Sequence, residues 1–528
     1  MKTPRGTLTP GMAAPPSTPI RARTAPDWLI LALACVAQFM VVLDVSIVNV
    51  ALPAMKTSLG FSNSGLQWVL NAYTLAFAGF LLLGGRAADL YGRRRMFIAG
   101  LVVFTGASLL GGFAQSQAML VTARAVQGLG GAILSPTTLT ILTTTFTEPK
   151  ARSRAMGLWS AVAGAGGAAG ALLGGVLTQE LSWRWILFIN VPIGIAALAA
   201  ARVFLQETRG QGERQPLDLA GAVLVTTGLT SFVYGLVRTT AVGWTSWQTV
   251  GALALAVALI GVFLIHEQKI AVAPLMPLRM FARRSIWSAN LVMTLLAGSI
   301  FAMWFFVSLY LQEVLGYSPL RTGFAFLPQT IAIILGAQLS SRLILRIGAR
   351  PILVAGGAFA AAGLFWLSFV GVHSAYWSDI FAPSVFITLG LGLSFTPIAF
   401  AATSGVAPKE AGLASGLVNT SRQIGGAVGL AVLATLATSV TASALHGAGA
   451  SAASRSVVMS ALSSGYTRAF AVSGAIAVGA MLASFLVPRL RRPAVAGATA
   501  AERSPVAGAP VGESPLSGPL EPQLADGL

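Results

Sequence analysis

The sequence predicts an all-α membrane protein with fourteen transmembrane helices, and three observations lead to this fold class. Only 9% of the 528 residues are charged, whereas about 25% are charged in soluble domains. Hydrophobic residues make up 55% of the chain. Apolar stretches of about 20 residues, the length that a helix needs to cross a bilayer, recur along most of the chain. These features exclude a soluble globular protein, a disordered chain and a nucleic-acid-binding domain.

The apolar stretches fall into two similar sets. They cover residues 28–52, 65–84, 96–114, 118–141, 155–178, 185–206, 218–237, 248–265, 288–311, 323–344, 351–371, 380–401, 412–437 and 468–488. The pattern that begins at Pro149, before the fifth stretch, recurs 259 residues later at Pro408, before the thirteenth. Parallel repeats in transporters form two like bundles. We therefore expect six-helix bundles over 28–206 and 288–488, with two extra central helices over 218–265.

Positive charges are unevenly distributed between the two sides of the predicted membrane protein. An even number of spans puts both termini on one side, which holds 25 Lys and Arg residues against six on the other. Because Lys and Arg concentrate in cytoplasmic loops, we expect both termini in the cytoplasm. The tails 1–26 and 489–528 have the composition of disordered segments, and the segment 438–467 fits no predicted element. The same bias explains much of the net charge of +18 without a nucleic-acid partner.

Neither a cofactor nor a metal site is indicated. One cysteine and three widely separated histidines provide no disulfide framework and no metal cluster. The chain lacks the GxxxxGK[ST] phosphate-binding motif, which disfavours an ATP-driven pump and leaves an ion gradient as the energy source for active transport. An intramembrane enzyme should have clustered His, Cys or acidic residues in its spans. Their absence predicts a protein that is not an enzyme.

Asp44 is the one acidic residue that lies clearly inside a predicted span. Its neighbours three and four positions away are Met40, Val41, Ile47 and Val48, none of which offers a side-chain hydrogen bond. Its partner must therefore come from another helix, from water or from a substrate. A carboxylate is poorly solvated inside a membrane, so such a residue suits proton binding. The alternative is an aspartate at a helix end, in the headgroup region.

Two arginines with polar neighbours also fall within predicted spans. Arg124 shares a helix face with Gln127 in the fourth span, and Arg422 shares one with Asn419 in the thirteenth. An arginine at the bilayer centre costs at least about 2.5 kcal/mol on insertion scales, so both side chains should face protein or water. With Asp44, these four residues are candidates for proton coupling or substrate binding. Structural arginines satisfied by backbone carbonyls are the alternative.

A glycine-containing loop joins the second and third spans. Gly85 and Gly92 permit a tight turn, and Arg93 follows Gly92 directly. Asp89 can cap a helix end or pair with a nearby arginine. A degenerate copy without the acid, 345–350, occupies the equivalent loop of the second half. The alternative is an ordinary cytoplasmic loop that happens to contain an aspartate, but the repeat argues against chance.

The fifth span carries glycines at regular spacing: Gly166, Gly170, Gly174 and Gly175. Small residues four positions apart let two membrane helices approach closely. The pattern therefore predicts a tight helix contact along this face. Generic packing of a span rich in alanine and glycine is the alternative.

Six segments of the chain resemble motifs of one known family. These segments are 43–53, 85–95, 120–132, 166–175, 183–194 and 310–319. Ala171 stands where the antiporter motif of that family has proline. Together the segments resemble the Major Facilitator Superfamily, and within it the fourteen-span drug:proton antiporter family of the EmrB/QacA type.

The resemblance implies the major facilitator fold and a proton-driven exporter of small lipophilic drugs or antibiotics in the bacterial cytoplasmic membrane. Its partners would be the substrate, protons and the lipid bilayer, and we expect a monomer without a cofactor. The resemblance assigns proton coupling and substrate binding to Asp44 and Arg124, and the outward-to-inward change to the loop that carries Asp89. The alternative is a related exporter of one metabolite, such as a natural product, a siderophore or an amino acid. A transport-dead sensor would have lost these coupling residues.

Overall fold

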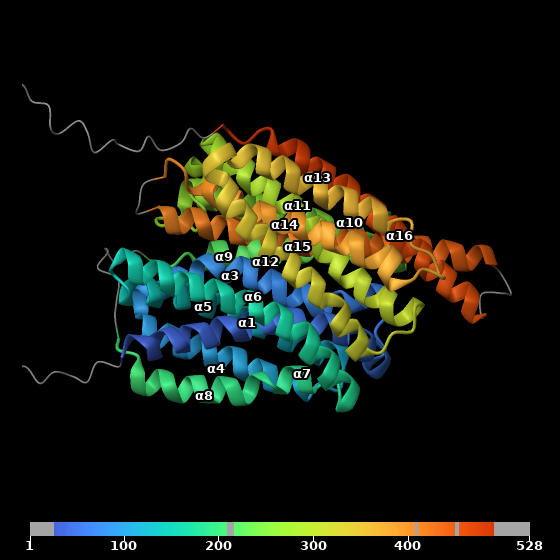
Figure 1. Cartoon of the computed structure of the whole chain (residues 1–528), viewed down its shortest axis with the longest axis horizontal. Coiled ribbons are helices and arrows are strands. Elements are labelled where there is room, and N and C mark those ends of the chain that lie inside the picture. Colours follow the sequence, from blue (N-terminus) through green and yellow to red (C-terminus); the bar gives the residue numbers. More distant parts are fainter. Residues whose placement is uncertain (1–25, 208–215, 407–409, 449–453, 490–528) are drawn as a thin grey trace, which may run out of the picture. The chain divides into compact units, whose positions relative to one another are not determined.

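The computed structural model describes residues 26–207, 216–406, 410–448 and 454–489 (Figure 1). Every regular element within these ranges is a helix. Fourteen helices are long and apolar enough to cross a membrane. The predicted fold class, an all-α membrane protein with fourteen spanning helices, is therefore confirmed. The predicted disordered tails fall almost wholly outside the described residues.

The first part of the chain supplies six candidate spans. Its helices are α1 (Asp27–Leu59), α2 (Asn63–Leu66), α3 (Trp68–Tyr91), α4 (Arg93–Gly112), α5 (Gln117–Thr145), α6 (Pro149–Glu180), α7 (Trp185–Phe188) and α8 (Asn190–Phe204). The short helices α2 and α7 lead directly into α3 and α8. Next come α9 (Leu219–Val242), α10 (Trp247–Ile265), the π-helix η1 (His266–Ile270) and the 3₁₀-helix η2 (Leu278–Ala282).

The last part of the chain supplies six further candidate spans. Its helices are α11 (Arg284–Leu309), η3 (Tyr310–Val314), α12 (Pro319–Ile347), α13 (Ala349–Leu367), η4 (Tyr376–Phe381), α14 (Ala382–Thr403), α15 (Ala411–Ala448) and α16 (Arg455–Ser484). The π-helix η3 continues α11 without a break, and the π-helix η4 leads directly into α14.

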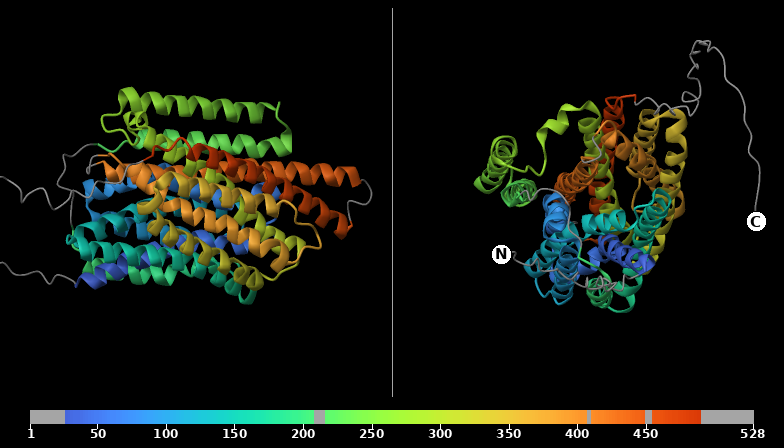
Figure 2. Two further views of the ribbon diagram at one scale, coloured as in Figure 1. Left: turned by 45° about the horizontal axis from the view of Figure 1, so that its top comes forward. Right: turned by 90° about the vertical axis from the view of Figure 1, so that its left-hand side faces the viewer.

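Packing contacts group these helices. In the first half, α1 packs against α5, α6 and α8, and α5 also packs against α3 and α4. In the second half, α11 packs against α14, α15 and α16, and α13 packs against α14 and α16. The largest contacts between the halves join α6 to α12 and α3 to α15. Helices α9 and α10 pack mainly on each other, and Figure 2 shows this green pair beside the remaining helices.

The segment 438–467, which matched no predicted element, extends two helices beyond their apolar spans. α15 runs to Ala448 and α16 begins at Arg455. A Cβ atom on Gly465 would lie 2.6 Å from the carbonyl oxygen of Ala437, so the two helices are in close contact here. Ser and Ala are tolerated in a helix but make it less hydrophobic than Leu, Ile or Val would. A prediction from apolar length therefore ended the thirteenth span too early and began the fourteenth too late.

Candidate functional site

A cluster of polar side chains lies buried between three helices of the first half. Asp44 on α1 accepts hydrogen bonds from Arg124 Nη1 at 2.6 Å and from Gln127 Nε2 at 2.7 Å, both on α5. Asn190, the first residue of α8, donates to it from Nδ2 at 3.1 Å. The side chains of Asp44 and Arg124 are 0% and 1% exposed, respectively. The carboxylate is therefore fully desolvated and surrounded by donors.

The guanidinium group has partners besides the carboxylate. Arg124 donates from Nε to the carbonyl oxygen of Val69 at 3.2 Å and from Nη1 to Gln127 Oε1 at 2.6 Å. It also lies 4.5 Å from the ring centroid of Tyr73 on α3, a cation–π distance. Desolvation of an ion pair is offset only when further hydrogen bonds satisfy both charges. The cluster meets this condition through these groups.

The amide of Asn190 also connects the cluster to α4. Its Nδ2 also contacts Ser108 Oγ on α4 at 3.1 Å, and that hydroxyl donates to the carbonyl oxygen of Leu187 at 2.8 Å. The Oδ1 atom of Asn190 is buried without a partner among the described residues. Motif resemblance marked its segment as typical but gave Asn190 no role, and Ser108 carried no signal at all. A polar residue in an otherwise apolar span is the one sign that could have identified Asn190.

Two amides complete the set of partners around the ion pair. The pair needs a negative charge on Asp44 that faces the guanidinium group of Arg124. Gln127 and Asn190 carry amide groups, which can both donate and accept hydrogen bonds. Gln127 uses both capacities, because it donates to Asp44 and accepts from Arg124.

The predicted glycine face of the fifth span lies against α1. Cβ atoms on Gly166, Gly170 and Gly174 would lie 3.1, 2.7 and 2.8 Å from atoms of α1. The nearest α1 atoms belong to residues 39–47, the stretch that contains Asp44. Gly175 instead faces α12, where a Cβ would lie 2.7 Å from the carbonyl oxygen of Pro319. Because these four glycines have no side chains, α6 can approach both α1 and α12 closely.

The loop between α3 and α4 contains an exposed local ion pair. Arg93 Nη2 at the start of α4 lies 3.3 Å from Asp89 Oδ1 near the end of α3. Gly92 has a φ of +107°, and a Cβ there would overlap the carboxylate of Glu207. Gly85 lies one turn or more before this loop on α3 and packs against Pro136 of α5. The predicted switch residues therefore lie at one end of α3, apart from the Asp44 cluster.

Arg422 and Asn419 lie together on α15, outside the Asp44 cluster. Arg422 Nη2 donates to Asn419 Oδ1 at 2.9 Å. Of the five predicted site residues, the structure brings Asp44, Arg124 and Gln127 together. It leaves Arg422 and Asn419 as a separate pair in the second half. Tyr73 on α3 contacts the first group through Arg124, and α3 packs against α15, the helix of the second group. Sequence reasoning assigned nothing to Tyr73.

At the C-terminal end of α1, polar contacts join the two halves of the protein. Lys56 Nζ donates to Glu313 Oε1 of η3 at 2.5 Å, and Tyr466 of α16 donates to Glu313 Oε2 at 2.7 Å. Ser308 donates to the carbonyl oxygen of Asn49 at 2.6 Å. These contacts hold α1 against α11 and η3. Sequence analysis assigned no role to Lys56 or Glu313.

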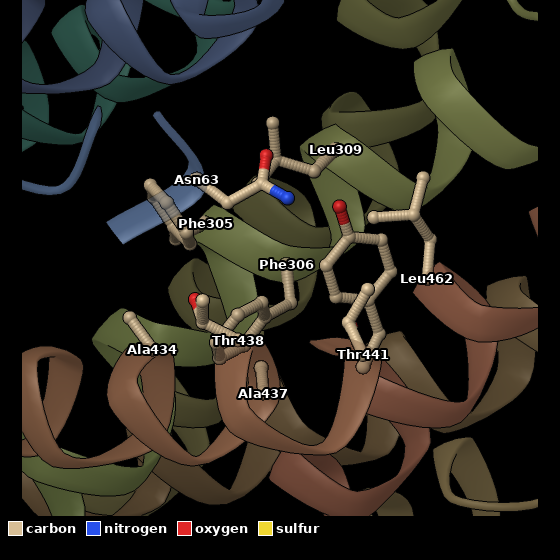
Figure 3. Close-up of a pocket in the computed structure, with 10 residues that line it drawn as sticks. Asn63, Phe305, Phe306, Leu309, Ala434, Ala437, Thr438, Thr441 and Leu462 are labelled. Carbon is tan, nitrogen blue, oxygen red and sulfur yellow. The ribbon is translucent and has the colours of Figure 1, made fainter. Parts of the chain in front are cut away.

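A small apolar pocket lies beside this junction (Figure 3). Phe305, Phe306 and Leu309 of α11 line it together with α15 residues and Tyr466 of α16. Figure 3 also shows Asn63 of α2 at its edge. The space holds no more than about one water molecule. The pocket is distinct from the Asp44 cluster, because its lining includes none of the residues of that cluster.

Comparison with known proteins identifies the family. The model of the Major Facilitator Superfamily matches residues 34–430. The chain belongs to this superfamily. It is 46% identical over 80% of its length to the cephamycin export protein CmcT of Amycolatopsis lactamdurans, covering 87% of that protein. It is 40% identical over 86% of its length to the puromycin resistance protein pur8 of Streptomyces alboniger, covering 89% of that protein.

Solved structures support the same fold. A bacterial homologue of the human lysosomal transporter Spinster, in an inward-facing and unoccupied conformation, has a TM-score of 0.61 and 17% sequence identity. The match covers 87% of this chain and 97% of that one. Family membership and the fourteen helices make this superfamily member a multi-pass membrane protein, as the sequence motifs predicted.

Proposed function

We propose that this chain is a proton-coupled antiporter that exports lipophilic drugs or antibiotics across the bacterial cytoplasmic membrane by alternating access. The names of its relatives support the export of drugs. Besides the cephamycin and puromycin proteins, they include the tetracenomycin C resistance and export protein of Streptomyces glaucescens, 38% identical. Under this proposal the chain works as a monomer, with both termini in the cytoplasm.

The observation that carries the proposal is the buried Asp44–Arg124 pair. It lies 0–1% exposed at the meeting point of α1, α5 and α8. Protonation of Asp44 would release Arg124, and deprotonation would restore the pair. If the protonated and paired forms favour opposite orientations of the halves, proton binding and substrate binding become linked, since each ligand need only bind one orientation better.

The helix packing suggests what would move. The two six-helix bundles, residues 28–206 and 288–488, would tilt against each other. The two central helices, residues 218–265, would follow them as an accessory pair. Contacts such as Lys56–Glu313 would close one end of the path and break when it opens. Because the positive-inside bias assigns that end to the outside, the described arrangement corresponds to a state closed outside.

A second candidate function is the export of one dedicated metabolite. Two relatives support it, because their names join export to a single antibiotic, cephamycin or tetracenomycin C. The site chemistry is the same for both candidates. The breadth of the exported compounds distinguishes them.

Drug-susceptibility profiling tests the function. A sensitive bacterial host expressing the chain should tolerate some lipophilic compounds several-fold better than a host with empty vector, and a protonophore should abolish the gain. Asp44→Asn should abolish it too, while Asp27→Asn, an exposed change on the same helix, should not. Resistance that persists with the protonophore, or in Asp44→Asn, would overturn proton coupling. Protection against one compound alone would favour the dedicated exporter.

A further inference from the structure

Arg422 is a membrane arginine without a counter-charge among the described residues. Within that part of the chain, its side chain donates one hydrogen bond, to the neutral amide of Asn419. Its Nε atom is buried and has no partner there. No described carboxylate lies within ion-pair distance of it, whereas Arg124 has Asp44 at 2.6 Å. The two membrane arginines are therefore in opposite electrostatic situations.

Tyr73 supplies a second unsatisfied group, on the helix α3 that packs against the helix of Arg422. Its side chain is 1% exposed and its hydroxyl has no hydrogen-bond partner among the described residues. The charged groups acting on that hydroxyl are Asp44, Arg124 and Arg422. Tyr73 belongs to α3 and Arg422 to α15, the helices that form one of the two main contacts between the halves. Both unpaired groups thus belong to the helices of this contact, where a major facilitator protein must separate and close.

The balance of charges at the contact between α3 and α15 indicates which kind of ligand would fit there. Asp44 compensates the charge of Arg124, whereas no described carboxylate compensates that of Arg422. These three residues together therefore carry a net positive charge. An uncompensated charge in a membrane interior is unfavourable unless it faces water or a partner. The planar guanidinium group binds a carboxylate with two parallel hydrogen bonds, and a hydroxyl is a suitable further donor. The same positive charge repels cationic ligands.

We propose that Arg422 binds the carboxylate group of a lipophilic substrate and that the Tyr73 hydroxyl donates a further hydrogen bond to it. This proposal rests on the proposed export function and names the substrate class of that site. The carboxylate would compensate Arg422 while Asp44 remains paired with Arg124. The apolar part of the substrate would lie among the surrounding apolar helices.

Equilibrium binding to the purified full-length protein in lipid nanodiscs tests the proposal. The probes are 1-pyrenebutyrate, a fluorescent aromatic carboxylate, and its methyl ester, which has no charge. Binding is measured by fluorescence anisotropy at neutral pH, with the signal from empty nanodiscs subtracted. Because hydrogen bonds to charged groups contribute about 1.5–3 kcal/mol, the wild-type protein should bind the acid at least about ten-fold more tightly than the ester.

Variants assign the preference to the two residues. Arg422→Met should bring the acid-to-ester ratio close to one without weakening the ester, and Arg422→Lys should retain part of the preference. Tyr73→Phe should lower the ratio but leave part of the preference, because it removes one donor and keeps the charge of Arg422. Arg455→Met removes an exposed charge at the start of α16 and should change nothing.

Three results would overturn the proposal. They are equal or weaker binding of the acid by the wild-type protein, no binding of the acid, and a full preference in Arg422→Met. An unchanged ratio in Tyr73→Phe would overturn the part assigned to Tyr73. The wild-type comparison stands even if a variant does not fold. Failure here would leave proton-driven export of other compounds intact, so the two proposals fail separately.

Discussion

Removing both charges of the buried Asp44–Arg124 pair should destabilise the protein less than the two single removals added together. Asp44 has no exposed surface and accepts three hydrogen bonds, at 2.6, 2.7 and 3.1 Å. Asp44→Asn leaves the Arg124 charge buried with only neutral partners. Removal of one partner from a buried ion pair costs about 3–5 kcal/mol. We expect each single variant, Asp44→Asn and Arg124→Gln, to fall in this range.

The double variant Asp44→Asn/Arg124→Gln should be less damaged than the sum of the singles. It contains no buried net charge, so the coupling energy should be about 2–3 kcal/mol. Reversible unfolding in mixed micelles with increasing SDS measures the three variants and the wild type. Asp27→Asn combined with Arg124→Gln is the control, because Asp27 is exposed and distant and its effect should be additive. Additive losses for the Asp44 and Arg124 pair would refute the reasoning.

Three further predictions concern the surrounding structure. Gly170→Leu should reach the membrane, as an immunoblot would show, yet confer no resistance, because even a Cβ atom at this position would lie 2.7 Å from an atom of α1. Full resistance in this variant would mean that export does not need the close approach of α6 to α1. Gly92→Ala should lower the melting temperature, since a φ of +107° strains any side chain by about 1–3 kcal/mol; an unchanged melting temperature would contradict this. Lys56→Glu should slow export by placing two acids together, and adding Glu313→Lys should restore part of the rate; no recovery in the swapped pair would exclude their contact as the cause.

Fold class was predictable from the sequence because hydropathy acts on each span separately. A stretch of about 20 apolar residues has few alternatives to a membrane helix. Helix ends were less predictable, because a helix continues into water without an apolar signature. The segment 438–467 shows this, since both of its helices extend past the apolar part.

The candidate site was partly predictable for a related reason. A charge inside a membrane needs a partner. This requirement, together with the polar neighbours of the two arginines, singles out Asp44, Arg124 and Arg422 in the sequence. The partners themselves lie on other helices. Asn190 and Tyr73 belong to the site through packing of α8 and α3 around α1 and α5, which no local pattern specifies. Sequence spacing likewise could not tell which arginine pairs with Asp44.

Proton movement driven by substrate is the most direct test of the account. The purified protein is reconstituted into liposomes containing a pH-sensitive dye, and a gradient of a compound that the chain exports in cells is then imposed without a pH gradient. Antiport predicts that wild-type protein moves protons against the direction of the compound, that reversing the gradient reverses the proton flux, and that Asp44→Asn shows no proton flux. Movement of the compound by the wild-type protein without a proton flux, or an unchanged flux in Asp44→Asn, would contradict the account.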